Sequence, residues 1–128
     1  MINYGFLKIM DINILDAENK IREELGKEGF GILTRIDLEE KFKEKLNVEF
    51  KKYIILGACN PANAYKAIQA EENIGLFLPC NIILYEKDGK TFISIIKPTV
   101  AMNMIENNEL KKLAEDIELK LQKVVDRL

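Results

Sequence analysis

Histidine is absent from the 128 residues of this chain, and cysteine occurs only twice, at Cys59 and Cys80. The absence of histidine removes the commonest general base and the commonest metal ligand in proteins. Within one chain it therefore excludes a Ser-His-Asp triad, a Cys-His pair and a histidine-based zinc site. Two cysteines are also too few for the disulfide framework of a small secreted domain.

Long apolar runs and blocks of positive charge are also missing. No stretch approaches the ~20 consecutive apolar residues that a membrane-spanning helix needs. The 19 basic and 21 acidic residues are spread along the chain and give a formal net charge of −2. We therefore expect no binding to nucleic acid or membrane. The N-terminus shows no basic leader or cleavage site, so we expect a soluble, cytoplasmic protein.

The length fits one domain, covering residues 1–128, with enough apolar content for one core. Alternating or dense apolar residues predict strands at 4–10, 29–36 and 50–58, a fourth strand entered through Pro79, and a fifth at 91–97. Asp88-Gly89 lies between the last two strands and predicts a hairpin turn. The dense end of the third strand predicts burial on both faces.

Capping residues predict where helices begin. Asn13 with Asp16 and Asp37 with Glu40 each place an acidic residue three positions after a favoured N-cap. The first of these helices follows the first strand, and the second is short. Residues 107–128 form a long amphipathic pattern. Its apolar stripe consists of Leu110, Leu113, Ala114, Ile117, Leu121, Val124, Val125 and Leu128.

Together these elements give the order β-α-β-(α)-β-(α)-β-β-α, with the bracketed helices short. A hairpin near the end and long helices at both ends predict an α+β fold with an antiparallel sheet of about five strands and helices on one face.

Each cysteine is followed by asparagine, and each Cys-Asn pair lies next to a proline at the end of a predicted strand. Asn60 suits an N-cap and Pro61 suits the first helical position, so a helix begins directly after Cys59. A helix N-terminus there favours an anion and lowers the pKa of a thiol that points at it. Asn81 is less easily explained, because asparagine is unfavourable inside a strand unless it is hydrogen-bonded.

Four interpretations of the two cysteines remain open. They are small buried core residues, part of a ligand pocket, a redox or soft-metal thiol site, or a reactive nucleophile. Two thiolates supply half of a tetrahedral zinc shell, so we assign no metal site from the sequence. A nucleophilic cysteine would lack a histidine partner. Glu71, after the helix that follows Cys59, is the general-base candidate if it turns inward, so the catalytic candidates are Cys59, Cys80 and Glu71.

The segments "GFGILTRIDL", "YIILGACNPANAYKAI", "EENIGLFLPCNIILYEKDGK" and "IIKP" resemble the family known as domain of unknown function 302. The resemblance covers nearly the whole chain, from about Tyr4 to the C-terminal helix. It implies an α+β fold of the TATA-box-binding-protein-like class and a homodimer, with no established activity. The suspected site that it transfers consists of Cys59, Asn60, Pro61, Pro79, Cys80 and Asn81.

We therefore expect a small cytoplasmic homodimer that binds a small ligand or a metal near the two Cys-Asn motifs, with no cofactor identified. The alternatives are a thiol-based redox protein or enzyme using Cys59 and Cys80, and a structural or interaction domain in which both cysteines are inert.

Overall fold

The computed structural model describes residues 2–128, and its elements follow the predicted order with two additions. They are β1 (Gly5–Met10), α1 (Ile14–Lys27), β2 (Gly31–Asp37), α2 (Leu38–Leu46), β3 (Tyr53–Cys59), α3 (Pro61–Ala70), the 3-10 helix η1 (Glu72–Phe77), β4 (Cys80–Lys87), β5 (Lys90–Ile96), α4 (Pro98–Ala101) and α5 (Asn108–Asp126). The sequence analysis did not predict η1 and α4.

The five strands form one antiparallel sheet in the order β1-β5-β4-β3-β2. This confirms the predicted α+β class and the predicted hairpin, in which Asp88 and Gly89 both have positive φ angles, 54° and 75°. The second strand begins two residues later than predicted. Gly29 there has a φ of 82°, a left-handed conformation that ends the turn after α1 and is incompatible with a regular strand.

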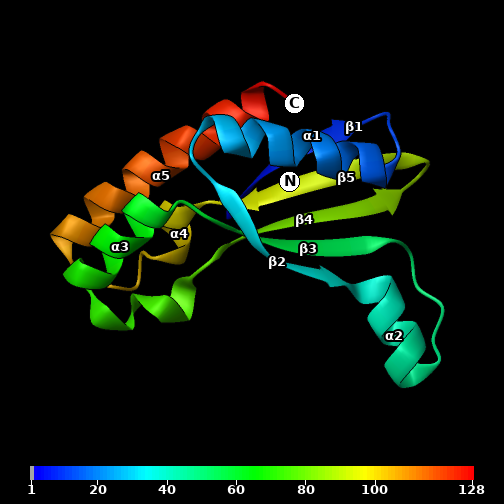
Figure 1. The fold of residues 1–128 in the computed structure, drawn as a ribbon, viewed down its shortest axis with the longest axis horizontal. Helices are drawn as coiled ribbons and strands as arrows, with labels where there is room; N and C mark the ends of the chain where they lie inside the picture. The colour runs from blue at the N-terminus through cyan, green and yellow to red at the C-terminus, as the bar shows by residue number, and fades with distance from the viewer. Residues whose placement is uncertain (1) are drawn as a thin grey trace.

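Helices α1 and α5 pack side by side on one face of the sheet and bury the main core (Figure 1). One face of α1, with Ile14, Ala17, Ile21 and Leu25, is buried, as is most of the predicted stripe of α5. The strands contribute alternate residues to this core, because successive strand side chains point to opposite faces. The fully buried strand residues include Leu56, Ile82, Leu84 and Ile95.

A second, smaller core lies beyond one end of the sheet, where α3, η1 and α4 gather against the first half of α5 (Figure 1). Its buried members are Ala67, Ile74, Met102, Leu110 and Ala114. Because β3 runs directly into α3 and η1 runs into β4, both Cys-Asn motifs lie at the boundary between this smaller core and the sheet. The candidate site is therefore at a junction between two packing units.

The other face of the sheet is not covered by α1 or α5, so the prediction that β3 is buried on both faces is wrong. Ile55 points to that face and is only half-buried. Helix α2 leads away from the sheet and has no buried residue (Figure 1). We call this apolar surface the open face, and it consists of Leu7, Ile9, Ile36, Tyr53, Ile55, Ile83, Tyr85 and Phe92.

None of the helices in residues 2–128 combines the length and the apolar character that crossing a membrane requires.

Candidate functional site

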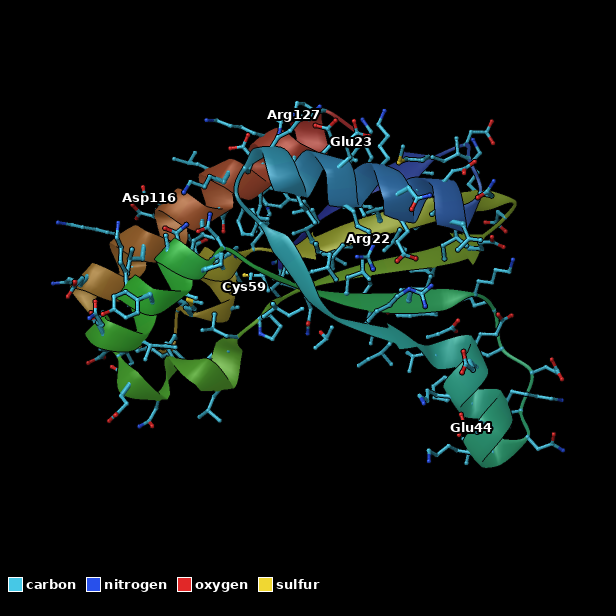
Figure 2. All side chains as sticks on the ribbon, in the orientation of Figure 1. Arg22, Glu23, Glu44, Cys59, Asp116 and Arg127 are labelled. Carbon is cyan, nitrogen blue, oxygen red and sulfur yellow. The ribbon has the colours of Figure 1, made fainter. Side chains whose placement is uncertain are left out.

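Cys59 is the last residue of β3 and lies where this strand runs into α3 (Figure 2). Its thiol is half-buried and free. Ala58, just before it, pairs directly with Cys80 on β4. The antiparallel pairing of β3 and β4 therefore brings both cysteines to the same end of the sheet.

Asn60 fixes the start of α3 through two hydrogen bonds. Its Oδ1 accepts from the backbone N–H of Asn63 at 3.3 Å, and its Nδ2 donates to the carbonyl oxygen of Glu28 at 3.2 Å. The predicted cap is therefore present, and it also ties α3 to the turn after α1. Pro61 occupies the first turn of α3 and is exposed. The Asn60 side chain already accepts a hydrogen bond from one of the free backbone N–H groups at the start of α3. Fewer of these groups are therefore available to bind an anion.

Cys80 begins β4 on the core side of the sheet and is buried, with 6% of its surface exposed. Pro79, before it, packs on Gly57, where an added Cβ would lie only 2.6 Å from the proline Cγ. Asn81, after it, points to the opposite face and is exposed. Its amide can therefore bond to water, which removes the difficulty of an asparagine in a strand.

A narrow space, the inner pocket, lies between α3, α5 and the ends of β3 and β4. It has a volume of about 20 Å³. Its lining is almost wholly apolar, apart from two asparagines and two thiols. The lining residues are Phe30, Ala58, Cys59, Asn60, Asn63, Ala64, Ala67, Leu78, Cys80, Met102, Leu113, Ala114 and Ile117.

A larger space, the outer cleft, lies on the other side of Cys80, between η1, α4 and the ends of β4 and β5. Its volume is about 240 Å³. It is lined by Leu76, Phe77, Leu78, Pro79, Cys80, Asn81, Ile96, Pro98, Ala101 and Met102. Three residues, Leu78, Cys80 and Met102, line both spaces, so the two adjoin.

Five of the six predicted site residues line one of these two spaces. Cys59 and Asn60 line the inner pocket, Pro79 and Asn81 line the outer cleft, and Cys80 lines both. Pro61 lines neither, because its side chain is on the exposed side of α3. The fold thus gathers the two Cys-Asn motifs around adjoining cavities.

Burial governs the chemistry of the two thiols. It raises the pKa of Cys80 from 9.0 to about 11, with a smaller contribution from the charge that Cys59 would carry. Burial likewise raises the pKa of Cys59. The lowering of the Cys59 pKa that a helix N-terminus could produce is therefore not found, and desolvation of the thiolate raises the pKa of this group. Both groups are neutral thiols at neutral pH.

Glu71 is not brought to the thiols. It follows the last residue of α3, whereas Cys59 lies two residues before the first, and at 1.5 Å per residue the ten residues of the helix separate them by roughly 15 Å. Glu71 lines neither the inner pocket nor the outer cleft. No three cysteine, aspartate or glutamate side chains within residues 2–128 converge closely enough to hold a metal ion.

The sequence analysis missed Asn63, Leu78 and Met102. Asn63 is buried, with 7% of its surface exposed. Asn63 shares a helix face with Ala67, four positions later, but only the structure shows that this face is buried. Nothing in the sequence marked Met102, because it lies outside every predicted helix and strand. Helix α4 brings it to the site.

A family model and a solved structure that match this chain agree with each other. The family described as domain of unknown function DUF302 matches residues 8–128. A solved structure, described as an uncharacterized conserved protein DUF302 from Bacillus stearothermophilus, is similar over 98% of this chain and 98% of that chain, with 31% sequence identity and a TM-score of 0.91. None of the curated proteins matches the chain.

Proposed function

The chain belongs to the family of the domain of unknown function DUF302, and from this premise we propose that it is a small cytoplasmic, homodimeric domain that binds a small molecule beside Cys80. The observation that carries the proposal is the gathering of both Cys-Asn motifs around the adjoining inner pocket and outer cleft. Small-molecule sites are typically concave and mostly apolar, with a few convergent polar groups. Two free thiols suit a reducing compartment such as the cytoplasm.

Binding is favoured over thiol catalysis for a chemical reason. A nucleophilic or redox-active cysteine reacts as the thiolate, and burial raises the pKa of both thiols. None of the described residues that line the inner pocket or the outer cleft can act as a general base, because the chain has no histidine and Glu71 lies at the far end of α3. In this proposal the Cys80 side chain lines the site as a small, polarisable group and undergoes no reaction.

The methionines provide a direct test of binding. Met102 lines both spaces and is 4% exposed, whereas Met104 is 76% exposed. We label the methionine methyl groups with ¹³C and titrate the protein with 2-butanone, a small molecule that fits the outer cleft. We expect a saturable shift of the Met102 signal and little change at Met104. Equal, non-saturating shifts of both signals would contradict the proposal.

The homodimer rests on a separate observation, the open face. Direct strand partners place Ile36, Ile55, Ile83 and Leu7 in one row, interrupted only by Ser94. Aromatic rings form the adjacent row: Tyr53 stacks on Tyr85 and Tyr85 on Phe92, with ring centroids 5.5 and 5.2 Å apart. Exposed apolar patches of this kind mark interaction sites.

A second copy of the chain fits this face by area. At about 4.8 Å between strands and 3.3 Å per residue, the sheet offers roughly 400 Å² of flat area. Side chains that project from the sheet and the exposed apolar residues of α2 increase this area. The total then approaches the about 800 Å² that each partner buries in a standard interface. The residues that define the open face are uncharged, but the ammonium groups of Lys51 and Lys87 lie over the rings of Tyr85 and Phe92, so the two-fold axis of the dimer must keep these lysines of the two copies apart.

A further inference from the structure

Asn63 is a buried polar side chain that the fold does not satisfy. The residue is 7% exposed and lines the inner pocket. Its backbone N–H is used by the cap of α3, but its side-chain Nδ2 has no hydrogen-bond partner within residues 2–128. A buried amide without a partner costs about 1–3 kcal/mol, and such groups in native proteins usually have a specific explanation.

The surroundings of Asn63 limit what can bond to it. None of the residues lining the inner pocket or the outer cleft, all within the described part of the chain, is charged. An ionised group placed in the inner pocket beside Asn63 would leave water without a compensating charge, at a cost of many kcal/mol. A carboxylate or phosphate is therefore excluded, and a neutral acceptor remains. A neutral acceptor differs from the anion that a helix N-terminus favours on its own.

The shape of the two spaces limits the ligand further. The inner pocket, about 20 Å³, holds little more than one oxygen-sized group, since one water needs about 10–15 Å³. The outer cleft, about 240 Å³, holds a small molecular body. Met102 lies between them, and its unbranched, flexible side chain can move aside to connect them.

Resting on the proposed binding function, we infer that the ligand is an uncharged, largely apolar molecule with one exposed hydrogen-bond acceptor, of the class of ketones, aldehydes and esters. Its carbonyl oxygen accepts from Nδ2 of Asn63 in the inner pocket, and its apolar body lies in the outer cleft beside Leu78 and Pro79. Asn63 is then the residue that selects an acceptor over a hydrocarbon of the same shape.

Three probes of nearly equal shape test this class by the Met102 methyl signal. They are 2-butanone, 2-methyl-1-butene, in which a methylene replaces the carbonyl oxygen, and propanoate, which carries a charge. Each is titrated into the wild-type protein and into Asn63→Leu, which keeps the number and branching of the side-chain heavy atoms and removes the donor. Asn63→Ala serves as a second variant, and the Met104 signal reports non-specific effects.

We expect the ratio of alkene Kd to ketone Kd to fall about tenfold in Asn63→Leu, the equivalent of one hydrogen bond. Propanoate should not saturate the Met102 signal in either protein. An unchanged ratio in both variants would overturn the inference while leaving the binding function intact, and it would mean that Asn63 bonds to a buried water only. Saturable propanoate binding would overturn the neutral class. If no probe moves Met102, the proposed function itself fails.

Discussion

Cys80 is the side chain at the site whose titration is changed most by folding. In the unfolded chain its thiol ionises near its ordinary pKa of 9.0, whereas burial in the native protein raises the pKa to about 11. Between these values the native state keeps a proton that the unfolded state has lost. The contribution to stability is therefore complete below the unfolded pKa and declines as the pH rises toward the folded pKa.

This predicts a pH-dependent difference between the wild-type protein and Cys80→Ala. The advantage of the wild type in free energy of unfolding should decrease by on the order of 2 kcal/mol between about pH 8 and pH 11. Urea unfolding of both proteins across this range measures it. Taking the difference in free energy of unfolding between the two proteins cancels the contributions of other groups that titrate in this pH range. Cys59→Ala, which removes a half-buried thiol, should show a smaller change with pH. A constant difference would mean that Cys80 is accessible to water.

The asparagines show how one residue type takes different roles according to its position. Asn60 caps a helix as the sequence predicted, and Asn81 is exposed on the side of the sheet away from the core. Asn63 was not singled out, because an asparagine in the first turn of a helix is ordinary in sequence terms. Only its burial among apolar side chains of α5 makes it unusual.

At the scale of elements, the helix starts were the most predictable features. Asn13, Asp37 and Asn60 each accept a hydrogen bond from the backbone N–H three residues later. This geometry is local, so it depends on neighbouring residues alone. The capping residues differ in their other contacts, because the side chain of Asn60 also donates a hydrogen bond to the carbonyl oxygen of Glu28, in another part of the chain.

That difference predicts unequal effects of two matched substitutions. Asn13→Ala removes an exposed cap and should lower the free energy of unfolding by about 1 kcal/mol. Asn60→Ala removes a cap and a part-buried bond between elements, and should lower it by about 2 kcal/mol. Chemical denaturation of the two variants beside the wild type provides the comparison. Equal losses would show that the bond to Glu28 contributes nothing.

The elements that the sequence did not reveal are η1 and α4, both short. The segment 72–77 is rich in apolar residues and resembled the approach to a strand, yet it forms a 3-10 helix whose Ile74 is fully buried in the smaller core. Tertiary packing against Ala67 and Met102 decides this conformation, and local sequence does not encode it.

At the scale of the whole molecule, the open face and α2 predict association. Helix α2 carries Leu38, Phe42 and Leu46 and yet buries no residue within the described chain. Light scattering coupled to size exclusion should give twice the monomer mass of 14.7 kDa. Ile9→Lys and Ile83→Lys place a charge on the open face and should give the monomer.

The control is Leu15→Lys, at an apolar residue of α1 on the opposite side of the sheet that is 59% exposed, against 48% for Ile9. It should leave the dimer intact. A monomeric wild type at high protein concentration would refute the dimer. A dimer that survives both open-face charges would place the interface on another surface.

The sequence by itself determined the α+β class, the order of the main elements, the helix caps and the hairpin, because each depends on periodicity or on neighbours a few residues apart. It also singled out both Cys-Asn motifs. Only the tertiary structure decided that the thiols stay neutral, that Glu71 lies far from them, that Asn63 lacks a partner and that one sheet face is open. These properties depend on desolvation and on contacts between segments distant along the chain, and local sequence patterns carry no record of either.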